Sequence, residues 1–295
     1  MLFRSEVIRE AIKVLRAAGR RFDLELTFLD APIGGAAIDA TGRALPDETL
    51  ALCRTSRAVL FGAAGGPRWD HLSGEARPER GLLRLRQELA VYANLRPVRV
   101  LVPGCSPLQT EVVAGTDFVI VRELTGGLYF GTPRGRSIDQ AIDTLRYTRE
   151  EIARVVRVAL QLARTRRRKL TSVDKANVLE TSRLWREVVE EEGRAFPDVA
   201  VQHMLVDTCA MELVRAPSRF DVIVTENMFG DILSDEAAGL LGSLGLLPSA
   251  SIGDGAPFLY EPVHGSAPDI AGRAIANPVG AIRSEERRVG KECRL

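Results

Sequence analysis

The 295-residue chain lacks several features that mark common classes of protein. No apolar run approaches the length of a membrane-spanning helix, so we expect no membrane as a partner. A net charge of +1 gives no general attraction to nucleic acid. The cysteines contain no CxxC pair, which is typical of reduced thiols in a cytoplasmic protein rather than of a disulfide or zinc framework. They are Cys53, Cys105, Cys209 and Cys293.

A Rossmann nucleotide-binding motif is also missing. No GxGxxG follows a predicted strand, and Gly239, Gly242 and Gly245 have the wrong spacing for one. A nucleotide site must therefore be built from other residues. The one strongly basic run, residues 164–169, lacks interleaved aromatic residues and is interpreted as the solvated end of a helix, where the dipole favours cations.

Strand-like and helix-like segments alternate along the chain. We expect strands near residues 24–29, 58–62, 117–122, 199–206 and 220–225, and helices near residues 137–167, 176–192 and from about 230 onward. Such alternation predicts an α/β fold with a largely parallel, twisted sheet flanked by helices.

Two carboxylates stand four residues apart, directly after the apolar run 220–225. If a helix begins near Gly230, Asp231 and Asp235 lie one turn apart on the same face, where like charges repel by a few tenths of a kcal/mol. A hard divalent cation would offset that repulsion. The alternative is that Asp231 caps the helix while Asp235 is solvated, and the local pattern favours neither interpretation.

Three arginines stand in apolar or constrained surroundings, namely Arg86, Arg96 and Arg122. Arg122 ends a predicted buried strand, where an unpaired charge would be costly, and a carboxylate is the partner that best suits a guanidinium. The alternative is an internal ion pair with Glu79, Glu123 or Asp117. Together with the two aspartates, the three arginines suggest a di-acid substrate held beside a cation.

Two further segments carry candidate residues. Asp174 is predicted to cap the helix at 176–192. Lys175 would then lie just inside the first turn, where a cation opposes the dipole and is poorly placed for stability alone. Residues 264–272 form a glycine- and proline-bounded loop that could hold a nucleotide, although a single histidine there, His264, is more often structural.

Both ends of the chain differ from its body. Apolar periodicity stops at Ile282, and residues 283–295 and 1–5 resemble translated adapter sequence. We therefore expect both segments to be non-native tails on a fragment.

Nine ordered motifs of the body resemble the isocitrate/isopropylmalate β-decarboxylating dehydrogenase family. They are GGAAID (34–39), RPERGLLRLR (77–86), NLRP (94–97), VRELTGGLYFG (121–131), TSVDKANVL (171–179), LWREVV (184–189), FGDILSD (229–235), GSLGLLPSAS (242–251) and HGSAPDIAGRAIANP (264–278). The resemblance implies the two-domain fold of that family. Residues 1–91 and 242–282 would form a cofactor-side domain, incomplete at both ends, and residues 92–241 a second domain for dimerisation, metal and substrate.

The resemblance also implies an activity. It is the NAD-dependent oxidative decarboxylation of 3-isopropylmalate to 4-methyl-2-oxopentanoate in leucine biosynthesis, with Mg²⁺ or Mn²⁺, in a homodimer with shared active sites. Tartrate/malate-type and homoisocitrate dehydrogenases are alternatives, as is a non-catalytic, dimer-forming remnant. Of the family's opening strand and GDGIGPE loop only Glu6 remains, so we expect this chain to have weak or no activity.

Individual roles follow from the same resemblance. The acid–base pair would be Tyr129 and Lys175 of the partner subunit. The metal ligands would be Asp231, Asp235 and Asp207 of the partner subunit. The substrate would contact Arg86, Arg96, Arg122, Leu82, Leu83, Val178 and Asp207. The cofactor would contact Glu79, Asn177, Glu261, His264, Gly265, Ser266, Ala267, Asp269, Ile270 and Asn277.

Two of these segments bear on specificity. Isocitrate-using relatives place a polar side chain where this chain presents Leu82 and Leu83, which suit an isopropyl group; the alternative is that both leucines are ordinary helix core. Arg86 lies one turn further along the same helix face, which favours the pocket. Asp269 can accept hydrogen bonds from ribose hydroxyls and would repel a 2′-phosphate, which favours NAD over NADP.

Overall fold

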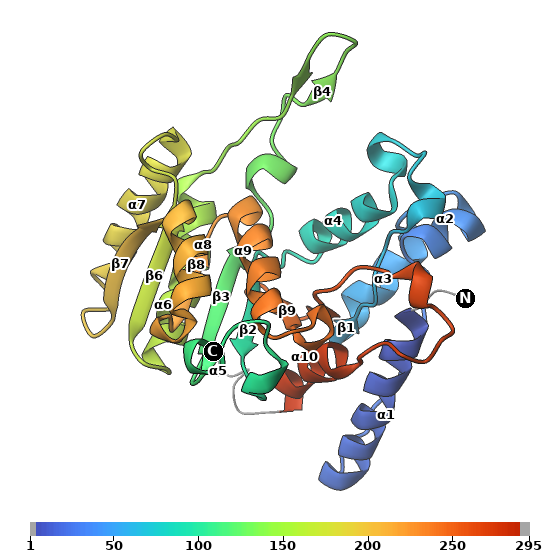
Figure 1. The fold of residues 1–295 in the computed structure, drawn as a ribbon. Coiled ribbons are helices and arrows are strands. Elements are labelled where there is room, and N and C mark those ends of the chain that lie inside the picture. Colours follow the sequence, from blue (N-terminus) through green and yellow to red (C-terminus); the bar gives the residue numbers. More distant parts are fainter. Residues whose placement is uncertain (1–3, 290–295) are drawn as a thin grey trace. The chain divides into compact units, whose positions relative to one another are not determined.

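The computed structural model describes residues 4–289, which form two compact units. Unit 1 comprises the residues up to Val91 together with those from Leu244 onward, and unit 2 comprises Tyr92–Ser243. Strands flanked by helices make up both units (Figure 1), and most of the strand pairs are parallel, so the predicted α/β class is confirmed. None of the described helices combines the length and apolar character needed to cross a membrane.

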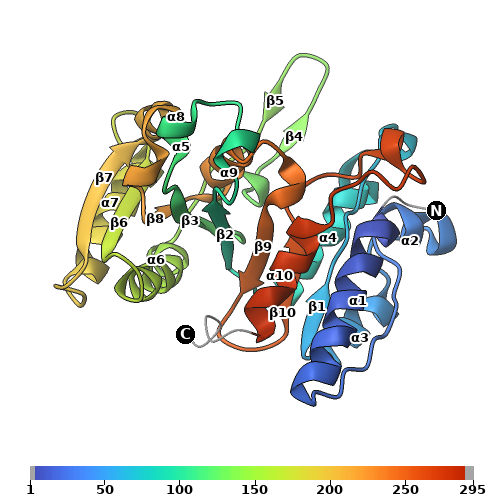
Figure 2. The same ribbon diagram turned by 60° about the horizontal axis from the view of Figure 1, so that its bottom comes forward.

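In unit 1 the strand order is β1-β10-β9, with β1 parallel and β9 antiparallel to β10. The helix α10 packs against β9 and β10, and α1 packs alongside α10 (Figure 2). The elements of unit 1 are α1 (Arg4–Phe22), α2 (Gly35–Thr41), α3 (Asp47–Thr55), β1 (Ala58–Leu60), η1 (Pro67–Trp69), η2 (Gly74–Ala76), α4 (Pro78–Glu88), η6 (Leu244–Leu246), β9 (Pro248–Ile252), β10 (Phe258–Pro262), η7 (Pro268–Ile270) and α10 (Val279–Val289).

In unit 2 the strand order is β2-β3-β8-β6-β7, and only the pairing of β2 with β3 is antiparallel among the described strands of this order. Its elements are β2 (Ala93–Arg99), η3 (Pro103–Cys105), α5 (Thr110–Val113), β3 (Asp117–Glu123), η4 (Gly127–Tyr129), β4 (Gly135–Arg136), β5 (Ala141–Ile142), α6 (Arg149–Arg164), β6 (Lys169–Asp174), α7 (Glu180–Gly193), β7 (Ala200–Leu205), α8 (Val206–Arg215), η5 (Pro217–Arg219), β8 (Val222–Thr225) and α9 (Asn227–Leu240).

The central strands of unit 2 are covered on both faces. α6 and α7 pack on one face of the strands, and α8 and α9 pack on the other (Figure 2). Strands that are buried on both faces have nearly continuous apolar sequences. β3 and β8 follow this pattern, and Phe118, Ile120 and Ile223 in them are fully buried. This arrangement places the ends of β2 and β3 against α9, which carries the aspartate pair.

The predicted strand at residues 24–29 is wrong. These residues form neither a helix nor a strand, they pair with no strand among the described residues, and Leu24 and Leu29 are 47% and 63% exposed. Alternation of apolar and polar residues makes a strand only where a neighbouring strand completes its backbone hydrogen bonds, and none is adjacent here.

The helix predicted over 137–167 begins later, at Arg149. Its true start is a capping box: the Thr148 side chain accepts from the Glu151 backbone amide, and the Glu151 side chain accepts from the Thr148 amide. The preceding residues instead form the β4–β5 hairpin, an arm that extends away from the strands of unit 2 (Figure 1), with Ile138 98% exposed at its tip.

The helix predicted from residue 176 begins at Glu180, with Leu179 at its N-cap. Lys175 therefore lies in the connection after β6 and not in a helical turn, so the argument from the helix dipole does not apply to it. Asp174 accepts a hydrogen bond from the Ala176 amide at 2.8 Å, and so stabilises this turn rather than the helix.

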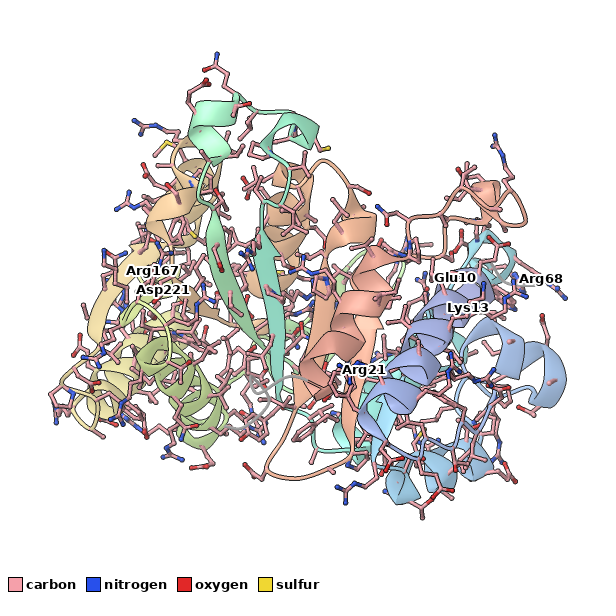
Figure 3. All side chains as sticks on the ribbon, turned by 90° about the horizontal axis from the view of Figure 1, so that it is seen from below. Glu10, Lys13, Arg21, Arg68, Arg167 and Asp221 are labelled. Atoms are coloured by element: carbon pink, nitrogen blue, oxygen red, sulfur yellow. The ribbon has the colours of Figure 1, made fainter. Side chains whose placement is uncertain are left out.

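Most of the basic run is exposed, as expected for a solvated helix end, but two of its arginines are paired with acids. After α6 ends, Arg166 contacts Asp117 Oδ1 at 2.7 Å and Asp221 Oδ1 at 2.9 Å. Arg167 lies beside the same buried Asp221, 3.6 Å from it (Figure 3). The run therefore joins the C-terminal end of α6 to the ends of β3 and β8.

Part of the tail predicted from Arg283 is helical, because α10 continues to Val289, and the non-native origin of the tail stays a prediction. Ser284 is fully buried, and its hydroxyl donates to the Glu261 carbonyl at 2.9 Å and accepts from the Ser249 amide at 3.1 Å. Residues 1–3 and 290–295 of the two predicted tails lie outside the described residues.

Candidate functional site

Arg122 stands at the centre of a cluster in unit 2 that joins β3 to α9. Its side chain is 2% exposed, and its Nη1 donates to Asp231 Oδ1. Its Nε and Nη2 both donate to Asn227 Oδ1, at 3.0 and 2.9 Å. Two side chains of α9, the Asp231 carboxylate and the Asn227 amide, thus offset the desolvation of this buried guanidinium.

Arg96 approaches the same helix from β2. Its Nη1 donates to Ser234 Oγ and lies 3.8 Å from Asp235 Oδ1, while its Nη2 lies 3.6 Å from Asp231 Oδ1. Its Nε donates to Asn94 Oδ1 at 2.7 Å. Two guanidiniums therefore converge on one face of α9, an arrangement that suits a ligand with carboxylate groups.

Tyr129, in η4 after β3, belongs to this cluster as well. Its hydroxyl donates to Asp231 Oδ2 at 2.9 Å, and the Arg122 guanidinium lies 5.8 Å from its ring centre. Burial first, and then the negative charge of Asp231, raise the pKa of Tyr129 to about 12. Tyr129 is therefore a protonated donor at neutral pH.

The two aspartates of α9 differ electrostatically. Burial acts to raise the pKa of Asp231, but the Arg122 and Arg96 guanidiniums outweigh it and hold that pKa below its usual value. Partial burial raises the pKa of Asp235, and the charge of Asp231 adds to the effect against the opposing Arg96. A second negative charge at Asp235 is thus disfavoured unless a cation is present.

The alternative interpretation of Asp231 as a helix cap is wrong. The N-cap of α9 is Glu226, whose side chain accepts from the Phe229 amide at 2.7 Å, so Asp231 lies beyond the first turn. Asp231 and Asp235 offer carboxylate oxygens one turn apart, which fit a hard divalent cation in kind. Within the described part of one chain, no three His, Cys, Asp or Glu side chains gather as a metal site.

Lys175 and Asp207 form a separate pair in unit 2. Lys175 Nζ lies 2.8 Å from Asp207 Oδ1, and this hydrogen bond lowers the pKa of Asp207. The Lys175 amide donates to Ser182 Oγ at 3.0 Å, which fixes the turn after β6. In the same turn Asn177 and Val178 are exposed, Val178 to 63%.

The predicted residues of unit 1 fall on α4 and β10. Arg86 and Glu261 form a buried ion pair of 2.8 Å, and Arg86 Nε has no hydrogen-bond partner among the described residues. Leu82 packs against the core formed around Leu85, so the helix-core interpretation holds for part of its surface, while Leu83 is half-buried. Glu79 is exposed at the start of α4.

The internal ion pairs proposed from the sequence have different partners. Arg86 pairs with Glu261, and Arg122 pairs with Asp231. Glu123 instead lies 3.7 Å from Arg154, and Asp117 contacts Arg166. Partners chosen by nearness in the sequence were therefore wrong for Arg86 and Arg122.

The loop predicted to hold the nucleotide lies between β10 and α10. Ala267 adopts a left-handed backbone at φ 36°, and His264 Nδ1 lies 3.1 Å from the Gly265 carbonyl. Ala267 and Ile270 pack against the small core shared by α1 and α10. Gly265 and Asp269 are exposed, Ser266 is half-buried, and exposed Asn277 accepts from the Val279 amide at 3.0 Å. The exposed Asp269 carboxylate, on a loop anchored by these contacts, could accept hydrogen bonds from the ribose hydroxyls of NAD.

Two residues of the unit 2 cluster were missed from the sequence. Asn227 and Tyr147 are both buried, and they contact Arg122 and the segment before Tyr129. A signal for Asn227 was present: it precedes Asp231 by four residues, as Asp231 precedes Asp235, so all three share one helix face. Tyr147 gave no comparable signal.

The chain resembles known proteins in sequence and in fold. A family model described as isocitrate/isopropylmalate dehydrogenase matches residues 4–289. The 3-isopropylmalate dehydrogenase of Geobacillus kaustophilus (strain HTA426) is 61% identical over 285 residues, covering 95% of this chain and 77% of the relative. That of Aquifex aeolicus (strain VF5) is 56% identical over 285 residues, covering 95% and 78%. The crystal structure of isocitrate dehydrogenase from Methylococcus capsulatus is similar with a TM-score of 0.85 at 37% identity, covering 98% of this chain and 83% of that one.

Proposed function

This chain belongs to the isocitrate/isopropylmalate dehydrogenase family, and we propose that it oxidises and decarboxylates 3-isopropylmalate, using NAD and a divalent metal, in leucine biosynthesis. The observation that carries the proposal is the cluster of Arg96, Arg122, Tyr129 and Asp231 in unit 2. It combines two buried cations for a di-acid, a protonated phenol, and a carboxylate suited to a metal ion. Among such di-acids, 3-isopropylmalate is chosen because the relatives that are 56% and 61% identical to this chain are 3-isopropylmalate dehydrogenases.

Each residue of the cluster has a defined task in this chemistry. Arg96 and Arg122 bind and orient substrate carboxylates, at positions fixed by their contacts with α9. Tyr129 holds a proton at its hydroxyl, which it can give to the carbon that loses carbon dioxide. Outside the cluster, Lys175 of the partner subunit is the proposed acceptor of the proton from the substrate 2-hydroxyl, and its contact with Asp207 orients it.

Asp231 and Asp235 would hold Mg²⁺ or Mn²⁺, with Asp207 of the partner subunit. When bound, the metal stabilises negative charge on the substrate oxygens, and NAD accepts the hydride. The contacts proposed for NAD are Glu79, Asn177, Glu261, His264, Gly265, Ser266, Ala267, Asp269, Ile270 and Asn277.

Arg86 is proposed as the third substrate arginine. Its buried Nε donor has no partner among the described residues, and a carboxylate oxygen would satisfy it. Leu83, half-buried on the same helix, is proposed to contact the isopropyl group together with Leu82 and Val178 of the partner subunit.

A homodimer with shared sites is supported by exposed apolar side chains in unit 2. Met211 of α8 is 50% exposed and Ile232 of α9 is 57% exposed, and the two helices pack together. Large apolar side chains exposed on adjacent helices are typical of an interface between copies. A cytoplasmic location is supported by the free thiols of Cys53, Cys105 and Cys209.

A substrate panel tests the proposed function. The purified chain is assayed with 3-isopropylmalate, malate, tartrate, isocitrate and homoisocitrate, each with NAD or NADP and Mg²⁺. We expect any turnover to be selective for 3-isopropylmalate with NAD, lost on chelation of the metal and restored by Mg²⁺ or Mn²⁺. Faster turnover of any other di-acid would assign that substrate instead, and metal-independent turnover would refute the proposed role of the aspartates.

A further inference from the structure

Asn227 connects three parts of the unit 2 site through one side chain and its backbone. Its Oδ1 accepts from Nε and Nη2 of Arg122, at 3.0 and 2.9 Å. Its Nδ2 donates to the Gly126 carbonyl at 3.1 Å, and its backbone amide donates to the Tyr147 hydroxyl at 3.0 Å. The side chain is almost fully buried, so water cannot replace these contacts.

Tyr147 supports the same region from the other side. A Cβ atom built on Gly126 would lie 2.7 Å from Tyr147 Cε1, and one built on Gly127 would lie 2.8 Å from Tyr147 Cζ. The two glycines therefore pack directly against the ring. Because Gly127 begins η4, which ends at Tyr129, the ring of Tyr147 sets the path of the segment that carries the proposed proton donor.

The hydroxyl of Tyr147 lies between two buried acids. It is 3.3 Å from Glu123 Oε2 and 3.3 Å from Glu226 Oε2. Glu123 anchors the same turn by accepting from the Thr125 and Gly126 amides, and Glu226 caps α9. One phenol thus joins the end of β3 to the start of α9.

We propose that Asn227, braced by Tyr147, is a positioning residue that holds Arg122 and Tyr129 in the arrangement in which they act on the substrate. A carboxamide meets both demands at this position, since its oxygen accepts from the guanidinium and its nitrogen donates to a carbonyl. This inference rests on the proposed function. Neither side chain touches the reacting atoms, and both act through Arg122 and Tyr129.

Asn227→Ala removes the three hydrogen bonds of this side chain, two with Arg122 and one with Gly126, and leaves Arg122 with fewer acceptors. We expect a higher KM for 3-isopropylmalate and a lower kcat, with a loss in kcat/KM of about 100-fold, as is typical of a misplaced catalytic group. The KM for NAD should stay within about twofold, because the proposed cofactor contacts are elsewhere. A purely structural role would lower the melting temperature and leave both constants unchanged per folded molecule.

Tyr147→Phe provides a second variant that keeps the ring against the glycines. It removes the hydroxyl, which accepts from the Asn227 amide and contacts Glu123 and Glu226. We expect the same selective pattern with a smaller loss, and this variant provides the test if Asn227→Ala does not fold. Thr116→Val is the control. Thr116 is buried in the same unit and its hydroxyl has no partner among the described residues, so its constants should match those of the wild type.

The wild-type chain is measured in parallel, by turnover and by calorimetric binding of 3-isopropylmalate. An active wild type whose two variants keep its kcat/KM per folded molecule overturns the inference and leaves the proposed function intact. A wild type that neither binds nor turns over 3-isopropylmalate refutes the proposed function, and the inference falls with it.

Discussion

At the scale of single residues, one carboxylate organises the candidate site. Asp231 contacts Arg122, Arg96 and Tyr129 at once. The motifs identified Arg96, Arg122, Tyr129 and Asp231 as candidates, but they could not give the contacts among them. Ion pairs join residues that are far apart in sequence, as Arg86 and Glu261 do across 175 positions, and local patterns carry no information on such pairs.

The proton of Tyr129 gives a prediction for alkaline pH. Its pKa is raised to about 12, so folding favours the neutral phenol; the stabilisation from it is complete below the ordinary value of 10.0 and is lost as pH rises through the folded value. A tyrosinate absorbance titration of wild type against Tyr129→Phe should therefore show no difference up to pH 10. Half-ionisation at pH 10 would contradict the raised pKa.

Gly230 gives a steric prediction. A Cβ atom at this position would lie 2.6 Å from Arg122 Cγ and 2.8 Å from Arg122 Cβ. These two atoms are next to the backbone of a buried residue, so they cannot easily move away. Gly230→Ala should displace Arg122 or α9, lower the free energy of unfolding by about 1–3 kcal/mol, and raise the KM for 3-isopropylmalate. Gly239, on the same helix with open space around it, is the matched control, and equal behaviour of the two alanine variants would refute the close contact.

At the scale of elements, the sequence predicted the kind of element better than its first residue. The apolar runs of β3 and β8 are continuous because both strands are buried on two faces, and this pattern correctly predicted both strands. The start of α6 was predicted at residue 137 instead of Arg149, and the start of α7 at residue 176 instead of Glu180, since periodicity fades in the polar segments before them. The run at 24–29 failed because pairing depends on a neighbour that no local pattern reveals.

The start of α6 can be tested directly. Thr148→Ala removes the side-chain acceptor for the Glu151 amide and should cost about 1 kcal/mol of unfolding free energy in denaturant. Thr148→Ser keeps the hydroxyl and should be close to wild type. Because Thr148 is exposed and outside the cluster, kcat and KM should not change. Equal stability of the two variants would show that the cap contributes nothing.

At the scale of the whole molecule, the proposed homodimer makes a prediction for α8. Met211→Lys places a charge where a large apolar side chain is now 50% exposed, and should convert dimers to monomers in sedimentation velocity, with activity falling in parallel. Val14→Lys, at a position of α1 that is 45% exposed in unit 1, is the control and should stay dimeric. A monomeric wild type would refute the proposed assembly.

The pairing of Lys175 with Asp207 has a consequence for genetics. These two residues contact one another, whereas Arg122, Tyr129 and Asp231 form a second group within the same chain. If one active site combines the Asp231 group of one subunit with the Lys175 group of the other, a mixed dimer of Lys175→Ala and Asp231→Ala chains has one site that carries both substitutions. The other site carries neither substitution and stays intact. Two alleles that are each inactive alone would then complement each other when expressed together.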